Sequence, residues 1–442
     1  MRIQLSDHFT YRRLLRFTLP SIVMMIFTSI YSVVDGFFVS NFVGKTPFAA
    51  INLIFPFIGI LGCFGFMLGT GGAALVSKNL GEGESERANR TFSMLTYAGI
   101  AIGVLLAILG IAFIEPLAVW MGADANMLPY CVAYGRILLL ALPAFMLQNM
   151  FQCFFVTAEK PTIGLVVTVL AGVTNMVLDF LFVAVLSWGL VGAAVATVMS
   201  QLVGGVIPLI YFACKNNSLL RLGKADLDLG ALWQSAFNGL SELVTNASIS
   251  VVSMLFNFQL LRFAGENGVA AYGAVMYVSF VFVALYIGYS IGVSPVISYH
   301  YGAGNQGELK NLFKKSTTLI FLSSVLLSIL SWLLASPLAS LFVGYDQELF
   351  EMTVRAFRFY SISVLFSGIC IFGSGFFTAL NNGVVSAVIS FLRMFLFQVI
   401  TVMILPEIWQ LDGIWYALFL PDMMASVVTV LFFVFQRKKY RY

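Results

Sequence analysis

The chain alternates long runs of apolar residues with short polar segments. Runs of about 20 apolar residues, the length that an α-helix needs to cross the hydrocarbon core of a bilayer, occur twelve times. Because backbone polar groups inside a bilayer must be satisfied within the segment, such runs predict transmembrane helices. The predicted spans are 14–43, 48–77, 92–114, 132–157, 162–186, 190–213, 232–261, 269–299, 316–335, 354–379, 383–405 and 411–435.

Composition supports a chain that lies within a membrane. Apolar residues make up 60% of the 442 positions and charged residues only 10%, whereas a soluble domain carries about 25% charged residues. Mean hydropathy is +0.95. The net charge of +4 is small and gives no reason to expect a nucleic-acid partner. We expect the lipid bilayer and a small-molecule substrate as partners.

The sequence predicts neither an enzyme nor a resident cofactor. His8 and His300 are the only histidines, and the five cysteines form no CxxC pair, so we expect no histidine or cysteine metal site. The stretch 302–307 matches the glycine spacing of a dinucleotide loop, but it follows an apolar span instead of a β-strand. No cofactor is expected beyond a coupling ion, H⁺ or Na⁺.

The placement of Lys and Arg predicts the orientation of the chain. One set of loops and termini holds eighteen of these residues, and the opposite set holds only five. Loops rich in Lys and Arg stay in the cytoplasm. We therefore expect a multi-pass protein of the plasma (inner) membrane with both termini in the cytoplasm. The five residues on the opposite face are Lys45, Arg136, Arg262, Arg355 and Arg358.

The two halves of the chain repeat one another. A shift of 221 residues pairs Gly81 with Gly302 and Trp188 with Trp409 without a gap. Both repeats begin on the same side of the membrane, which is typical of secondary transporters that handle substrate between their halves. The prediction is an all-α membrane protein of two pseudo-symmetric six-helix bundles. Their boundaries are 1–214 and 231–442, with a cytoplasmic linker at 215–230.

Four polar residues of the first half are predicted to lie together. Asp35 and Asp179 are isolated carboxylates in long apolar runs, and each costs about 2.5–3.5 kcal/mol to insert unless it is paired, protonated or bound to a cation. Asn175 precedes Asp179 by one helical turn on the same face. Thr197, on the next span, is expected at a similar depth. These oxygens can hold a cation such as Na⁺, or the carboxylates can take up protons.

A structural polar network is the alternative interpretation of this cluster. Hydrogen bonds alone would then join the first, fifth and sixth spans, and the Thr197 hydroxyl would bond to a carbonyl of its own helix. We favour a functional site, because neutral Asn residues would join helices at less cost than two carboxylates.

The second half carries different charged groups. Glu242, Arg393 and Asp422 each fall about ten residues into a predicted span, with Pro421 expected to kink the helix beside Asp422. We interpret Arg393 and Asp422 as an ion-paired network, structural or involved in coupling. Glu242 is a candidate second acidic site for a proton or a cation.

Together these residues resemble the MATE (multidrug and toxic compound extrusion) family of cation-coupled antiporters, over essentially the whole chain. The segments that carry the resemblance are Leu19-Pro20, Tyr31–Asp35, Gly69–Gly72, Leu80-Gly81, Asn175–Phe180, Gly192–Thr197, Asn238–Leu243, Gly268–Tyr272, Tyr301-Gly302, Arg393 and Pro421-Asp422.

The resemblance implies export of organic cations, drugs or amphipathic compounds in exchange for H⁺ or Na⁺. It places the cation site at Asp35, Asn175, Asp179 and Thr197, and Glu242 at an acidic position that some branches use. Residues 361–380 contain no carboxylate, so we expect coupling in the first half, and we expect a monomer. Two alternatives remain: a flippase for lipid-linked saccharides and, from another class, an intramembrane aspartyl protease.

Overall fold

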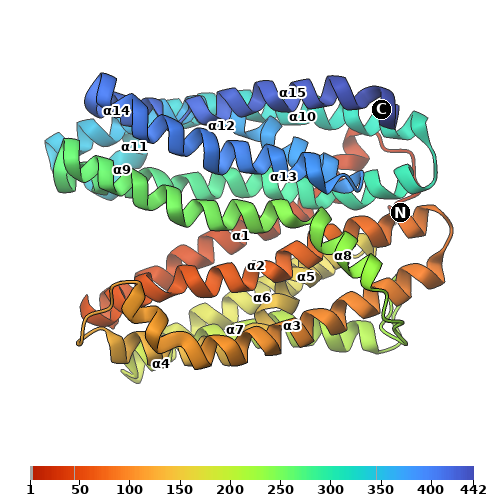
Figure 1. The fold of residues 1–442 in the computed structure, drawn as a ribbon, viewed down its shortest axis with the longest axis horizontal. Coiled ribbons are helices and arrows are strands. Elements are labelled where there is room, and N and C mark those ends of the chain that lie inside the picture. Colours follow the sequence, from red (N-terminus) through yellow and green to blue (C-terminus); the bar gives the residue numbers. More distant parts are fainter. Residues whose placement is uncertain (1–2, 44, 345) are drawn as a thin grey trace.

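The computed structural model describes residues 3–43, 45–344 and 346–442, except for some side chains between residues 32 and 45. All regular structure within them is helical (Figure 1). The first half contains α1 (Tyr11–Phe42), α2 (Lys45–Gly81), α3 (Ser85–Trp120), α4 (Leu128–Leu140), α5 (Leu142–Thr157), α6 (Pro161–Asp179), the π-helical η1 (Phe180–Val185) and α7 (Gly189–Ala213). The second half contains α8 (Leu229–Asn238), α9 (Leu240–Gly302), α10 (Gln306–Leu333), α11 (Ala335–Val343), α12 (Gln347–Ala379), α13 (Gly383–Phe391), the π-helical η2 (Leu392–Leu396), α14 (Phe397–Tyr416) and α15 (Leu420–Tyr440).

Several helices begin at a side chain that satisfies their first free amides. Thr10 accepts a hydrogen bond from the amide of Arg13 at the start of α1, over 3.3 Å. Asp228, Asn305 and Asp346 cap α8, α10 and α12 in the same way, three residues before the amide that each accepts. These polar residues mark helix starts because the first turn has donors without partners in the helix.

The prediction of an all-helical membrane protein is confirmed. Ten helices of the described chain are long and apolar enough to cross a membrane, and α4 with α5 make an eleventh span that is bent by 55°. One of the ten, α9, has 63 residues and a non-helical backbone at Gly265, with φ of 60° and ψ of −150°. A straight helix of that length would measure about 95 Å, three times the bilayer core. Counting its two arms separately gives the predicted twelve spans.

Two predicted spans contain a break that the sequence did not indicate. The predicted span 232–261 is interrupted at Gly239, where α8 ends and α9 begins. The last span, predicted from residue 411, follows a non-helical backbone at Gln410, with φ of 53° and ψ of −131°, and a turn at residues 417–419 interrupts it before α15 begins at Leu420. Neither break could be predicted, because a short break inside an apolar run leaves the hydrophobic pattern unchanged.

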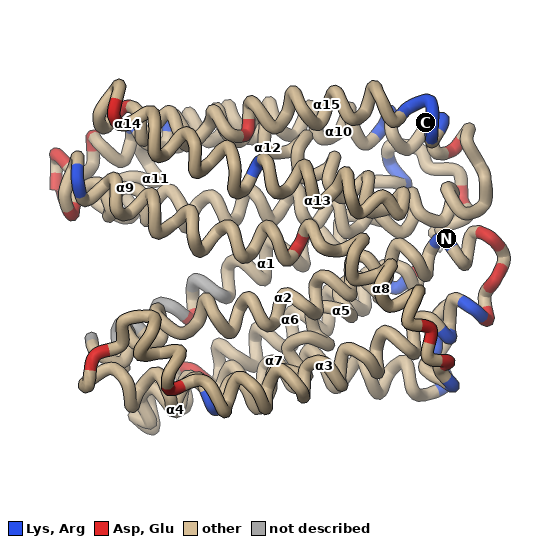
Figure 2. Tube along the Cα trace, in the orientation of Figure 1, with Lys and Arg blue, Asp and Glu red and all other residues tan. Residues whose placement is uncertain are grey.

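The two halves come together at one end of the molecule and diverge toward the other (Figure 1). Both chain termini lie at the end where they meet, which we call the terminal end. There α1 and α2 of the first half pack along α9, and α2 also contacts α8. Most Lys and Arg residues gather at the same end (Figure 2). The N-terminal Arg2 and the side chain of Lys45 lie outside the described residues.

Glycines allow the backbones of the two halves to touch at the terminal end. A Cβ atom on Gly81 of α2 would overlap the carbonyl oxygen of Tyr299 in α9, and one on Gly302 would overlap the carbonyl oxygen of Lys78. The 221-residue shift converts each of these contacts into the other, so the contact is reciprocal. A side chain at either glycine would force the helices apart. The same holds deeper in the interface for Gly71 against Ser235 and for Gly239 against Met67.

The N-terminal segment, residues 3–10, ties the two halves together at this end. The amide of Leu5 donates to Oε1 of Glu159, at the end of α5, over 2.8 Å. The amide of Phe9 donates to Oε1 of Glu308, in the first turn of α10, over 2.9 Å. Leu5 and Phe9 are themselves fully buried. One short segment therefore donates to a carboxylate of each half.

We predict that Gly81→Ala lowers the melting temperature of the purified protein more than Gly59→Ala does. The added methyl group at position 81 meets backbone that cannot rotate away, and overpacking of this kind costs about 1–3 kcal/mol. Gly59 lies in the same helix with no atom within 4 Å of an added Cβ. It therefore controls for the helix propensity of alanine. Equal melting temperatures in detergent would contradict a rigid contact at Gly81.

A second prediction concerns Glu308, which is 6% exposed. It accepts hydrogen bonds from the Phe9 amide and from Asn311 Nδ2, and it pairs with His8. We expect Glu308→Ala to raise hydrogen exchange at the amides of residues 4–10 by about tenfold, since bonds to a charged acceptor are worth about 1.5–3 kcal/mol. Hydrogen-exchange mass spectrometry measures this directly.

The matched control for that experiment is Glu348→Ala. Glu348 is also an acidic residue in the first turn of a helix, α12, but it is exposed. Unchanged exchange in residues 4–10 of the Glu308 variant, or an equal increase in the control, would show that Glu308 does not hold the segment.

Candidate functional site

Two helices of the first half bring the predicted acidic residues together. Asp35 on α1 lies beside both Asp179 and Asn175 on α6. Asn175 is 2% exposed and Asp179 is 0% exposed. The approach of the two helices depends on Gly172 of α6, where a Cβ atom would lie 2.5 Å from the ring of Phe27 in α1. The predicted neighbourhood of Asp35, Asn175 and Asp179 is therefore present.

The oxygens of this cluster lack hydrogen-bond donors. Oδ1 of Asp35, Oδ1 of Asn175 and both carboxylate oxygens of Asp179 are buried, and none of them has a partner in the described chain. Buried polar atoms are almost always satisfied, and each exception needs a physical reason. Two adjacent carboxyl groups also repel each other when both are ionised. A proton or a monovalent cation between them would remove both costs.

Thr197 does not bond to this cluster in the described structure. Its hydroxyl donates to the carbonyl oxygen of Ala193, one turn earlier in α7, over 3.0 Å. This is the local bond that the structural alternative foresees for a threonine within an apolar helix. The hydroxyl oxygen keeps a free lone pair, so Thr197 can act only as an acceptor toward a cation.

Two tyrosines lie near the acids, although no role at the site was predicted for either of them. Tyr31 lies one turn before Asp35 on α1 and is close to Gln148 of α5, and Tyr134 of α4 lies near both aspartates. Tyrosine is abundant in membrane helices, so composition alone could not single these two out.

Both π-helical segments lie next to ionisable residues. The segment η1 begins at Phe180, directly after Asp179, and η2 contains Arg393. A π-helical turn is wider than an α-helical turn and shifts every following side chain around the helix axis, and it occurs often at functional sites. The apolar residues of these segments resemble those of any membrane helix, so periodicity could not predict them.

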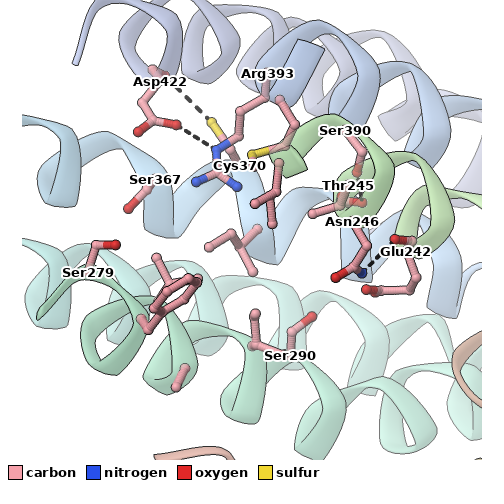
Figure 3. Close-up of a pocket in the computed structure, with 18 of the residues that line it drawn as sticks. Glu242, Thr245, Asn246, Ser279, Ser290, Ser367, Cys370, Ser390, Arg393 and Asp422 are labelled. Atoms are coloured by element: carbon pink, nitrogen blue, oxygen red, sulfur yellow. Dashed lines mark hydrogen bonds and ion pairs between the residues drawn. The ribbon is translucent and has the colours of Figure 1, made fainter. Parts of the chain in front are cut away.

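A cavity of about 350 Å³ lies mainly within the second half (Figure 3). Its walls come from α9, α12, α13, η2, α14 and α15, and Met25, Ser29 and Thr70 of the first half complete it. The lining is rich in serine and threonine hydroxyl groups. Three charged residues, Glu242, Arg393 and Asp422, also line it.

Arg393 and Asp422 form a buried ion pair in this cavity. Nε of Arg393 donates to Oδ1 of Asp422 over 2.6 Å, and their side chains are 12% and 5% exposed. The hydroxyl of Ser363 donates to the other carboxylate oxygen, and the thiol of Cys370 lies 3.6 Å from the Asp422 carbonyl oxygen. The pairing expected from the sequence is present. Removing one partner of such a pair leaves an uncompensated buried charge.

The expected kink at Pro421 is wrong. Pro421 lies in the first turn of α15, after a turn at residues 417–419, so it begins the helix instead of bending it. Proline is favoured at this position because the first amides of a helix need no partner within it. Asp422 follows in the same first turn, where a negative charge is favoured by the helix dipole. Glu242 likewise lies in the first turn of its helix, α9.

No cluster of three or more His, Cys, Asp or Glu residues in the described chain has the geometry of a metal site. The acidic pair of the first half offers two carboxylates and an amide oxygen, which are hard oxygen ligands of the kind that hold cations in proteins.

Known proteins resemble the chain over its whole length. The multidrug export protein MepA of Staphylococcus haemolyticus strain JCSC1435 is 26% identical over 309 residues, which are 69% of this chain and 67% of that protein. MepA of Staphylococcus aureus strain MSSA476 is 22% identical over 429 residues, covering 95% of this chain and 93% of that protein. A solved structure described as the outward-facing conformation of a multidrug resistance MATE family transporter has a TM-score of 0.92. It is 21% identical and covers 98% of this chain and 97% of its own.

A family model matches each half of the chain separately. The model named MatE matches residues 20–181 and again residues 243–404, which together make up more than half of the chain. The two matches begin at nearly the offset that the internal repeat shows. This chain therefore belongs to the MatE family of transporters and is a multi-pass protein of the plasma membrane.

Proposed function

We propose that the protein exports amphipathic organic compounds, including organic cations and drugs, in exchange for H⁺ or Na⁺ bound at Asp35, Asn175 and Asp179. The observation that carries this proposal is the pair of adjacent carboxyl groups, three of whose oxygens (Oδ1 of Asp35 and both of Asp179) are buried without a hydrogen-bond partner in the described chain. The names of the MepA relatives supply the substrate class. The family match and the MepA relatives support a transporter and not an enzyme.

The coupling step follows from charge. When the site is empty, the two carboxylates repel and α1 and α6 are held apart by the repulsion or by water between them. A bound proton or Na⁺ removes the repulsion, so the two helices close on the site. Asn175 and the free lone pair of Thr197 would complete the oxygens around Na⁺, whereas a proton needs only the carboxylates.

Helix α1 is the element that can pass this change to the rest of the molecule. It packs on α6 beside the acidic pair and on α9 of the second half. It also contains Pro20, where one backbone hydrogen bond is missing and the helix bends more easily. Cation binding at Asp35 therefore displaces the helix that forms part of the contact between the halves.

The direction of transport follows from the orientation. We place the terminal end in the cytoplasm, because most Lys and Arg residues gather there (Figure 2). The described conformation is then closed toward the cytoplasm, and cations reach the site from outside while substrate leaves. We propose a monomer whose bundles are 1–214 and 231–442, with 215–230 as linker. Glu242 is proposed as a second acidic site, and the Arg393–Asp422 pair as a support for the second bundle.

The two alternative functions gain no support. A lipid-linked saccharide flippase needs a strongly cationic cavity, and Arg393 is the one basic residue that lines the cavity of the described chain. Neither the family model nor the relatives point to a protease.

We predict that Asp35→Asn and Asp179→Asn each reduce gradient-driven efflux from proteoliposomes at least about tenfold, while the melting temperature stays within a few degrees of the parent. The amide keeps the shape of the carboxyl group but cannot take up a proton or neutralise Na⁺. Asp226→Asn is the matched control, since Asp226 is exposed at the surface and pairs with Arg90. Full coupled transport in both aspartate variants would refute the proposal.

The same vesicles decide which cation is coupled. A pH gradient and a Na⁺ gradient are imposed separately on the parent protein, at equal membrane potential. Efflux that follows only one gradient identifies the coupling ion, and efflux that follows neither shows that the protein does not act as an antiporter for H⁺ or Na⁺.

A further inference from the structure

The cavity of the second half contains an arginine whose outer nitrogen atoms are free. Arg393 meets Asp422 through Nε alone, over 2.6 Å. Figure 3 shows its two terminal nitrogens, Nη1 and Nη2, turned away from Asp422 and toward the cavity. Neither nitrogen donates to another group of the described chain. A guanidinium group buried in a membrane helix thus keeps its two-pronged face available.

This arrangement differs from the other arginines that meet carboxylates in the described chain. Arg90 uses Nη1 for Asp226 and Nη2 for Glu86, and Arg355 uses Nη2 for Asp412. At Arg393 the single hydrogen bond from Nε to Asp422 fixes the guanidinium group in place, and the carboxylate balances its charge. The free Nη edge has the spacing that binds a carboxylate or a sulfonate through two parallel hydrogen bonds.

A second charged group lines another part of the same cavity. Glu242 lies in the first turn of α9, and Figure 3 shows its carboxylate bordering the cavity near Asn246. The side chain has no hydrogen-bond partner in the described chain, because Asn246 donates to the backbone carbonyl of Glu242 and not to its carboxylate. Glu242 is thus the acidic residue of the lining that has no basic partner in the described chain.

The remaining lining suits an amphipathic molecule. The rings of Phe256 and Tyr272 stack at 4.9 Å on the wall formed by the two arms of α9, and both residues line the cavity. Hydroxyl groups such as those of Ser367 and Ser390 provide hydrogen bonds that rotate to fit different partners. A ligand here meets a flat apolar surface, a cationic edge and a carboxylate.

We propose that this cavity is a binding site for amphipathic zwitterions, with the ligand's carboxylate or sulfonate on Nη1 and Nη2 of Arg393 and its cationic group toward Glu242. The inference rests on the proposed export function and names a substrate class for it. An anion at Arg393 alone would add an unbalanced negative charge, because the charge of Arg393 is already balanced by Asp422. A ligand that carries one positive and one negative charge leaves the net charge of the cavity unchanged. A zwitterion is therefore favoured over a simple anion.

The test compares two fluorescent probes that differ in one charge. One is an amino-rhodamine dye with a free carboxylate, and the other is its methyl ester, which is a cation of nearly the same shape. Binding to the purified full-length protein in detergent is measured by fluorescence anisotropy, with no gradient present. We expect the parent to bind the free acid about tenfold more tightly than the ester, as one charge-assisted hydrogen bond would give.

The decisive variant is Arg393→Lys, which keeps the positive charge for Asp422 but removes the two-pronged edge. We expect it to weaken binding of the free acid about tenfold and binding of the ester less than twofold. Glu242→Gln is expected to weaken both dyes. Arg358→Lys is the matched control, since Arg358 stacks on Trp332 outside the cavity. It is expected to leave both affinities unchanged.

A double variant covers the case in which lysine does not fit. Arg393→Met with Asp422→Leu removes the ion pair as a unit, and such replacements are often tolerated. It should likewise abolish the preference for the free acid. A parent that prefers the ester, or variants that change both dyes equally, would overturn the inference. The binding test uses no gradient, so its failure would not affect the proposed coupling role of Asp35 and Asp179. Conversely, loss of coupled transport in the aspartate variants would not affect the binding result.

Discussion

Direct contact between backbones of the two halves is the constraint on which the rest of the structure depends. At the terminal end Gly81 and Gly302 each lie against a carbonyl group of the opposite half, and Gly71 and Gly239 repeat the contact deeper in the interface. Without side chains between them, the helices meet closely enough for dispersion forces to hold them, although the lipid supplies no hydrophobic drive. The same closeness makes the contact intolerant of small shifts. The halves therefore fit together or separate, with little in between.

The two halves share a scaffold but treat their charges differently. In the first half, Asp35 and Asp179 face each other with oxygens that lack donors, so the energy of this site changes with whatever cation it holds. In the second half, Asp422 is satisfied by Arg393 and Ser363, so the charge of this pair is fixed. The duplication preserved the contact pair Gly81 and Gly302 and not the acids. One half is built to respond to cations, and the other offers a stable polar cavity.

Much of this could be predicted from the sequence, because the bilayer imposes strong rules on it. The twelve spans follow from apolar length, and the isolated charges of Asp35 and Asp179 mark a site because burying them is costly. The breaks at Gly239 and before Leu420 could not be predicted, since they leave the hydrophobic pattern intact. The kink predicted at Pro421 was wrong for a related reason. A proline that bends a helix and a proline that begins one look alike in a sequence. The π-helical turns beside Asp179 and Arg393 depend on packing that no local pattern records.

The first half also contributes to the wall of the cavity that lies mainly in the second half. Met25 and Ser29 of α1 and Thr70 of α2 form part of its wall, and the Ser29 hydroxyl reaches the carbonyl oxygen of Phe280 at 3.4 Å. Glu242 stands three residues after Gly239, which touches Met67 across the interface. When the halves part at the terminal end, the chamber loses a wall and its carboxylate moves with that surface. In the proposed orientation this parting admits a molecule from the cytoplasm, and the return to the described conformation leaves it an exit only at the opposite end, with no separate gate.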